Sequence, residues 1–152
     1  MESVFSSTYT KFEALLSQNY EFGQLLTETT LLLQREISHY DWVGFYLLDR
    51  DNMMLVLGPY TGSATEHTHI PVGKGICGQV ASSSQTMVVQ DVSQQANYLS
   101  CSMDVQSEIV VPIIKEGRFV AEIDIDSHAY APFSREDEEF LSTIAGRLAM
   151  RF

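Results

Sequence analysis

The residues of this chain best suited to chemistry are two cysteines and a group of acids. Cys101 lies shortly before an apolar hairpin that carries four carboxylates, and Cys77 lies in a glycine-rich segment. The four acids are Glu108, Glu122, Asp124 and Asp126. A thiol beside acids that the fold turns inward is suited to a redox site that binds a small cation and donates a proton.

The spacing of the acids in the hairpin predicts which of them lie together. Side chains alternate along a strand, so residues 122, 124 and 126 share one face and residues 121, 123 and 125 share the other. A three-residue loop at 115–117 pairs Ile114 with Arg118 and places Glu108 opposite Asp124. A two-residue loop sends Glu108 to the isoleucine face. We favour the three-residue loop because it keeps Glu108 with the other acids.

Two interpretations of this acidic face remain open from the residues alone. It can be a solvated outer face, as in many antiparallel sheets. It can also line a pocket, because Val110 and Pro112 share the face and make it less polar. A pocket of clustered carboxylates favours an ammonium group, and an acid whose pKa is raised by its neighbours can donate a proton.

Two further segments could contribute to such a pocket. Gly75 and Ile76, with their neighbours in residues 73–78, could offer backbone N–H groups to a carboxylate at a helix N-terminus. Cys77 is either a packed side chain or a reactive thiol, whose pKa a helix N-terminus lowers if the thiol faces the site. Trp42 and Tyr46 share one face of a predicted strand. They are either core residues or the aromatic surface that contacts a methyl or thioether group.

Length and composition narrow the class of protein. The 152 residues fit a single domain over 1–152, and 45% hydrophobic residues suffice for a core. The net charge is −11 and the nine basic residues are scattered, so we expect no nucleic-acid or membrane partner. No apolar run is long enough for a bilayer and no signal peptide is visible, which predicts a cytoplasmic protein. Without CxxC or HxxxH spacing, we expect no metal and no cofactor.

The pattern of elements predicts an α+β fold in which helices flank a central antiparallel sheet of about five or six strands. The predicted helices cover most of residues 1–38, then 79–83 and 134–151, with Ser134 as an N-cap. The predicted strands cover residues 42–48, 54–57, 87–89, 107–115 and 118–126. The polar stretch 91–106, which contains Cys101, is longer than a simple connection and is typical of a site or a lid.

Five segments together resemble the free methionine-(R)-sulfoxide reductases, a family of stand-alone GAF domains. They are residues 42–48 (WVGFYLL), 57–62 (LGPYTG), 70–78 (IPVGKGICG), 107–113 (SEIVVPI) and 124–127 (DIDS). The similarity extends over roughly residues 20–150, with the spacings preserved from Trp42 to Asp126. It implies the reduction of free methionine-(R)-sulfoxide to methionine.

The resemblance also implies roles for individual residues. Cys101 takes the place of the catalytic cysteine and Cys77 that of a second cysteine. The implied substrate-holding residues are Glu108, Asp124, Asp126, Trp42 and Tyr46, with Glu108 or Asp126 as the acid. The chain departs from the typical pattern at His67, where a resolving cysteine is usual, and at Glu122, where an aliphatic residue is usual.

The implied mechanism is attack of the Cys101 thiolate on the sulfoxide sulfur, which leaves Cys101 as a sulfenic acid. Two routes then remain for recycling: Cys77 forms a disulfide that a thioredoxin-like protein reduces, or an external thiol attacks directly. We favour Cys77, the only other thiol. The alternative function is a GAF sensor that binds a small ligand or a redox signal without catalysis. The sequence leaves the oligomeric state open, including a homodimer.

Overall fold

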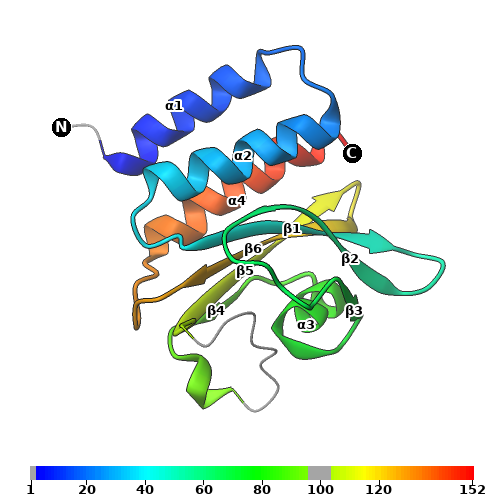
Figure 1. Ribbon diagram of the computed structural model, residues 1–152. Helices are drawn as coiled ribbons and strands as arrows, with labels where there is room; N and C mark the ends of the chain where they lie inside the picture. Colours follow the sequence, from blue (N-terminus) through cyan, green and yellow to red (C-terminus); the bar gives the residue numbers. More distant parts are fainter. Residues whose placement is uncertain (1–2, 96–103) are drawn as a thin grey trace.

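The computed structural model describes residues 3–95 and 104–152 and confirms the predicted α+β fold. Six antiparallel strands form one sheet in the order β3-β2-β1-β6-β5-β4 (Figure 1). The strands are β1 (Trp42–Asp49), β2 (Met54–Thr61), β3 (His69–Pro71), β4 (Met87–Val89), β5 (Ser107–Lys115) and β6 (Arg118–Ser127). The helices are α1 (Val4–Leu16), α2 (Phe22–Glu36), α3 (Gly75–Ser83) and α4 (Arg135–Ala149), with a 3-10 turn η1 (Val92–Gln94).

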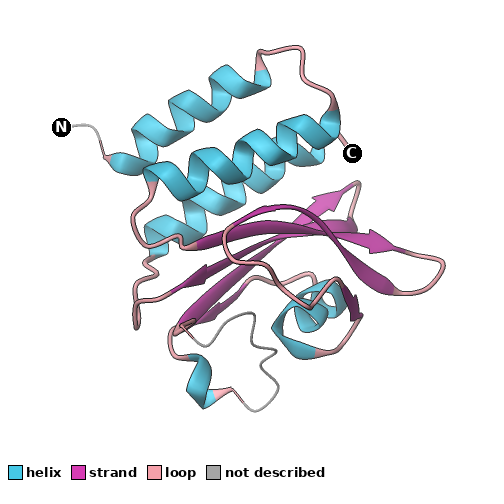
Figure 2. Ribbon diagram, in the orientation of Figure 1, coloured by secondary structure: helices cyan, strands magenta, loops and turns pink. Residues whose placement is uncertain are grey.

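The helices cover the two faces of the sheet unequally. Helices α1, α2 and α4 form a layer on one face, and α3 lies on the other (Figure 2). The main core fills the space between the first layer and the sheet, where Ile123 and Ile125 of β6 are fully buried with Leu33 of α2 and Leu148 of α4. The acids of β6 therefore point toward α3, as strand alternation predicts.

The helix signals of the sequence are largely confirmed. The predicted N-terminal helical region is divided at residues 17–21 into α1 and α2. Ser134 caps α4 in a reciprocal capping box with Asp137, which satisfies two backbone N–H groups. The C-terminal helix ends at Ala149 rather than at Arg151.

The predicted register of the β5–β6 hairpin is wrong, whereas the predicted face of Glu108 is right. The turn has two residues, Glu116 and Gly117, both with positive φ, and Lys115 pairs with Arg118. A bulge then inserts an extra residue on β6, since Ile114 pairs with Phe119 but Ile113 pairs with Ala121. The shorter turn alone would turn Glu108 to the other face, and the bulge reverses that shift. Glu108 therefore lies opposite Asp126, not Asp124.

Two element boundaries also differ from the prediction. Strand β2 continues through Gly58 and Pro59 to Thr61, beyond the predicted end of this strand at residue 57. This proline is tolerated because the β1–β2 register is irregular between Gly44 and Tyr46, opposite this segment. Helix α3 begins at Gly75, four residues before the predicted start, so Cys77 lies in its first turn.

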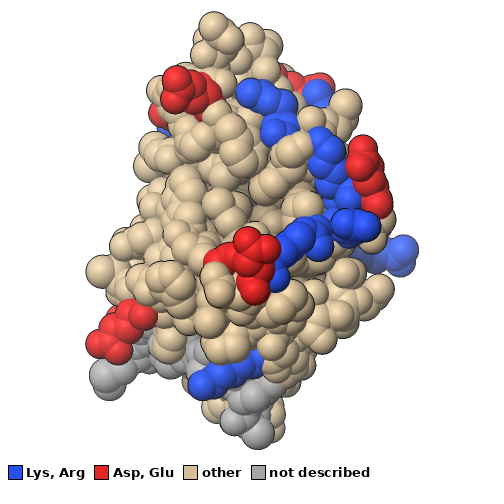
Figure 3. Space-filling model, turned by 90° about the vertical axis from the view of Figure 1, so that its right-hand side faces the viewer, with Lys and Arg blue, Asp and Glu red and all other residues tan. Residues whose placement is uncertain are grey.

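The surface offers two observations on partners. Within the described residues, no helix has both the length and the apolarity needed to cross a membrane. The basic residues that look scattered in the sequence form an arc on the face drawn in Figure 3, with acidic side chains beside several of them. The expected absence of a nucleic-acid partner therefore stays a prediction.

Candidate functional site

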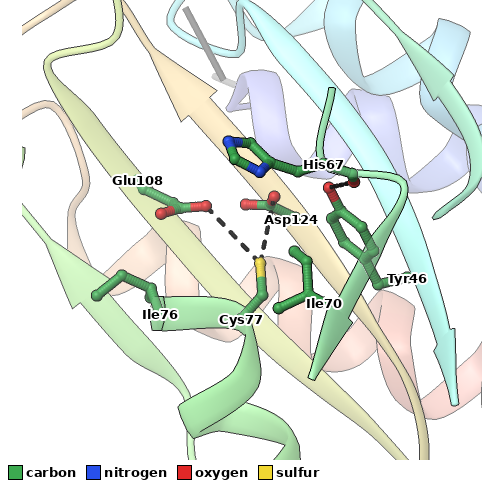
Figure 4. A pocket seen from close by; sticks show the side chains of 7 residues that line it. All are labelled: Tyr46, His67, Ile70, Ile76, Cys77, Glu108 and Asp124. Carbon is green, nitrogen blue, oxygen red and sulfur yellow. Dashed lines mark hydrogen bonds between the residues drawn. The ribbon is translucent and has the colours of Figure 1, made fainter. Parts of the chain in front are cut away.

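A small pocket lies between α3 and the acidic face of the sheet. Its volume is about 10 Å³, close to the space that one water molecule occupies. Figure 4 shows the seven lining side chains around it. They are Tyr46, His67, Ile70, Ile76, Cys77, Glu108 and Asp124. The pocket thus combines one thiol, two carboxyls, an imidazole and a phenol with apolar walls.

The glycine-rich segment positions the thiol over the sheet. A Cβ atom on Gly78 would lie 2.6 Å from the carbonyl oxygen of Pro71, so only glycine lets α3 approach β3 this closely. The first helical hydrogen bond of α3 joins the Gly78 N–H to Lys74 O at 2.9 Å. Cys77 lies just before this bond and its side chain points toward β5 and β6 (Figure 4).

The Cys77 thiol lies against the carboxyl groups. Its Sγ is 3.4 Å from Asp124 Oδ2 and 3.9 Å from Glu108 Oε2. Burial raises the pKa of Cys77 well above its ordinary value, and the charges of Asp124, Glu122 and Glu108 raise it further. The expectation that the helix N-terminus lowers this pKa is therefore wrong, because burial and three acids outweigh the helix dipole.

The acids on this face are buried rather than solvated, which excludes the interpretation of the face as an outer surface. Glu108 is 4% exposed, Asp124 is 1% exposed, and Glu122 and Asp126 are fully buried. Burial raises the pKa of Asp124, against the effects of Glu108, Cys77 and the charge of His67. Burial, and then the charge of Asp124, raise the pKa of Glu122, against a smaller effect of the nearby Cys77 thiol.

Glu122 differs from the other acids in its bonding. Neither of its carboxyl oxygens makes a hydrogen bond of ordinary geometry with a described residue. The carboxyl nevertheless lies close enough to Cys77 to raise the pKa of the thiol. One oxygen of Asp124, Oδ1, also has no partner among the described residues. A buried carboxyl without donors is costly, so this face carries stored electrostatic strain.

Two aromatic residues fix the wall of the site beside β1. The Tyr46 hydroxyl donates to the carbonyl oxygen of His67 at 2.7 Å, which holds the 62–68 segment over the pocket. Trp42 donates through Nε1 to Ser63 O at 2.9 Å and stacks on Tyr60. A Cβ on Gly44 would meet the Trp42 ring at 2.4 Å, so glycine is required beneath the indole.

The structure brings together five of the predicted site residues. Tyr46, Ile76, Cys77, Glu108 and Asp124 line the pocket. Trp42, Gly75 and Asp126 are buried beside it but do not line it. The predicted nucleophile, Cys101, lies outside the described residues.

Sequence reasoning missed the contribution of two lining residues. The sequence marks His67 only as a replacement for a cysteine, and it gives Ile70 no role, yet both lie on the pocket wall. Their sequence positions gave no sign of this, because the pocket forms only when α3 packs on the sheet. Among the described residues, Cys77, Glu108 and Asp124 also form a group able to hold a metal ion, with one ligand atom of each within 4.8 Å of the others.

Comparisons with known proteins identify the family of the chain. The model of the GAF domain family matches residues 21–152. Free methionine-R-sulfoxide reductase of Escherichia coli (strain K12) is 34% identical over 137 residues, which cover 90% of this chain and 81% of that protein. The X-ray structure of free methionine-R-sulfoxide reductase from Neisseria meningitidis in complex with its substrate has a TM-score of 0.90 at 33% identity, covering 98% of this chain and 87% of that one.

A third relative matches over a similar extent. The type II free methionine-R-sulfoxide reductase from Thermoplasma acidophilum has a TM-score of 0.80 at 36% identity. That match covers 86% of this chain and 94% of the other. The similarity therefore includes the whole sheet and the elements that line the pocket.

Proposed function

Since this chain belongs to the GAF domain family, and within it to the free methionine-R-sulfoxide reductases, we propose that it reduces free methionine-R-sulfoxide to methionine. The enzyme acts on the amino acid itself rather than on methionine residues of proteins. The observation that carries the proposal is the buried acidic face beside a thiol, with neither lysine nor arginine among the lining residues of the pocket.

The acids account for recognition of the substrate ammonium. Glu108, Asp124 and Asp126 lie on one face of the sheet, and an ammonium group is the complement of clustered buried carboxylates. We therefore assign the ammonium of the free amino acid to Glu108, Asp124 and Asp126. A peptide-bound methionine has no such group and is excluded from this site.

The start of α3 is suited to the substrate carboxylate. The N–H groups of Gly75 and Ile76 precede the first helical hydrogen bond, and the N-cap residue Lys74 makes no side-chain capping bond. Backbone donors of a helix N-terminus favour an anion. Recognition of both charged ends selects the free amino acid, and Tyr46 and Trp42 supply aromatic surface for the methylthio end.

The reaction is assigned to Cys101, on the basis of its position in the family pattern. Its thiolate attacks the sulfoxide sulfur, Glu108 or Asp126 protonates the oxygen, and methionine leaves. The oxygen stays on Cys101 as a sulfenic acid, so the sulfoxide is reduced as the cysteine is oxidised. Both carboxyl groups are buried on the face of the sheet that lies toward the pocket, where a positioned acid can act as the proton donor.

Recycling is assigned to Cys77. Its thiol loses a proton to Asp124, 3.4 Å away, and attacks the sulfenic acid to form a disulfide and water. A thioredoxin-like dithiol then reduces this disulfide. The competing route, direct attack by an external thiol, predicts full turnover with thioredoxin after Cys77→Ser, which separates the two.

The test is formation of methionine from three substrates with excess dithiothreitol: the free R epimer, the free S epimer and a peptide-bound sulfoxide. We expect product from the free R epimer alone, and a loss of at least about a thousandfold in Cys101→Ser. Glu116→Gln, which removes an exposed carboxylate from the same hairpin, serves as the matched control and keeps full activity. Absence of product from all three substrates would support a binding GAF sensor instead.

A further inference from the structure

Three of the seven side chains that line the pocket also meet the requirements of a metal site. We propose that Cys77, Glu108 and Asp124 bind a borderline-soft divalent cation such as Zn²⁺. We further propose, resting on the proposed function, that this cation keeps the substrate ammonium out of the acidic face. The spacing of ligands in the sequence predicts no metal, because the three residues come from α3, β5 and β6 and are far apart in the chain.

The ligand atoms are spaced as a tetrahedral zinc ion requires. With Zn–S near 2.3 Å and Zn–O near 2.0 Å, the sulfur–oxygen edge of a tetrahedral site is about 3.5 Å. The observed distances from Cys77 Sγ are 3.4 Å to Asp124 Oδ2 and 3.9 Å to Glu108 Oε2. Both sulfur–oxygen distances lie within a few tenths of an ångström of this edge, and all three ligand atoms lie within 4.8 Å of one another. A water molecule would complete the four ligands.

A separate observation concerns carboxyl oxygens on this face that lack hydrogen-bond donors. Glu122 is fully buried near the Cys77 thiol, and neither of its oxygens makes a hydrogen bond of ordinary geometry with a described residue. Asp124 Oδ1 is likewise without one. Buried carboxyl oxygens that lack donors favour a bound cation, and the oxygens of Glu122 and Oδ1 of Asp124 lie on the same face as the three ligands.

The size of the pocket and the type of ligands select the ion. About 10 Å³ accepts a bare ion or one water, whereas methionine sulfoxide requires the walls to separate first. The thiolate ligand disfavours Mg²⁺ and Ca²⁺, which prefer oxygen, and favours zinc or cobalt. Binding displaces the Cys77 proton, forms a metal–thiolate bond and involves no electron transfer.

Cobalt is the probe for the site itself. Cys101→Ser protein, freed of metal by a chelator and then of the chelator, is titrated with Co²⁺. We expect a thiolate-to-cobalt charge-transfer band and the visible bands of a four-coordinate ion, complete at one equivalent and abolished by Zn²⁺. Since Cys77 is the remaining thiol of this variant, the further change Cys77→Ser must remove the charge-transfer band.

A second variant keeps the test valid if Cys77→Ser fails to fold. Asp124→Asn in the same Cys101→Ser background should weaken cobalt binding at least about tenfold, whereas Glu116→Gln should leave it unchanged. Three results would each overturn the proposed metal site. They are a missing charge-transfer band, a band that survives in Cys77→Ser, and equal cobalt affinity of Asp124→Asn and Glu116→Gln.

Competition with substrate is measured in a single turnover, which needs no resolving thiol. Zn²⁺ should raise the substrate concentration at half-maximal rate without changing the maximal rate, and a chelator should reverse the effect. Within Cys77→Ser, the inhibitory Zn²⁺ concentration should rise at least about tenfold. If chelator-treated protein forms no methionine while the cobalt band is present, the proposed function fails and the metal site stands. Full activity at saturating Zn²⁺ would show that the cation does not compete with the substrate.

Discussion

Asp137 and Glu122 are both buried acids of this domain, on opposite sides of the sheet. Asp137, 1% exposed at the start of α4, accepts hydrogen bonds from the Tyr40 hydroxyl and from the N–H and hydroxyl of Ser134, and contacts His39 Nε2, all at 2.7–2.9 Å. Glu122 is fully buried and has no such partner among the described residues.

This difference in bonding sets opposite pKa shifts. Burial raises the pKa of Asp137, but its bonds with His39, Ser134 and Tyr40 outweigh that effect and lower the pKa overall. For Glu122, burial dominates and the pKa is raised well above the ordinary value. An acid that stabilises the fold thus has its donors within the chain. An acid whose donors are missing costs stability, which is expected where an external cation or ammonium is to bind.

The largest expected effect follows from removing the satisfied acid. Asp137→Ala should lower the free energy of unfolding by about 2–4 kcal/mol, because it removes the helix cap and leaves the buried Tyr40 hydroxyl without its acceptor. Urea denaturation gives this value. Glu136→Ala, an exposed acid of the same helical turn, is the control and should cost less than about 1 kcal/mol. If Asp137→Ala and Glu136→Ala lose the same free energy of unfolding, the hydrogen bonds of Asp137 do not stabilise the fold.

The opposite result is expected for the unsatisfied acid. Glu122→Leu should raise the free energy of unfolding by about 1–3 kcal/mol, since it removes a buried carboxyl that makes no hydrogen bond of ordinary geometry with a described residue and keeps the volume filled. Urea denaturation in the presence of a chelator measures the gain.

Glu122→Gln is the control for the stability gain expected of Glu122→Leu. Its amide is isosteric but remains buried without partners, so it should gain much less stability than leucine at neutral pH. A destabilised Glu122→Leu protein would mean that the carboxyl has partners that compensate for its burial.

Much of this arrangement follows from the sequence. Strand alternation placed Asp124 and Glu122 on one face, and the Ser134 signal identified the cap that Asp137 completes. These predictions succeed because they depend on local periodicity and local hydrogen bonds. The register of the hairpin failed because the bulge near Val120 depends on packing across strands, for which the turn residues carry no signal.

The burial of the acidic face also could not be predicted. It depends on α3 beginning at Gly75 and crossing the sheet, and the helix signal was evident only from Gln79. The same limit applies to the three proposed metal ligands, because Cys77, Glu108 and Asp124 meet only after three elements pack together. The role of Cys101 still rests on the family pattern alone.

The pH dependence of stability sharpens the comparison, with an expected effect of at most about 1.4 kcal/mol per pH unit for each group. The lowered pKa of folded Asp137 gives stability that is present above its unfolded pKa of about 3.9 and is lost as pH falls through the folded pKa. The raised pKa of folded Glu122 means that the folded protein holds a proton the unfolded chain has lost. Stability therefore falls as pH rises above about 4.3 toward the folded pKa.

The two slopes can be separated by neutral variants. In urea denaturation from pH 3 to pH 8 with a chelator present, Glu122→Gln should flatten the decline above about pH 4.3 and leave the acid side unchanged. Asp137→Asn should flatten the rise on the acid side alone. If Glu122→Gln follows the wild-type curve over the whole range, the carboxyl is not held protonated in the folded protein.

The smallest effect is expected where a satisfied acid loses one partner of several. His39→Gln should lower the free energy of unfolding by about 0.5–1 kcal/mol, because the His39 side chain is 24% exposed and the two Ser134 bonds and the Tyr40 bond to Asp137 remain. Urea denaturation at neutral pH measures the change, with His128→Gln as an exposed histidine control. A loss as large as that of Asp137→Ala would show that a single donor, rather than the complete set, stabilises the buried carboxylate.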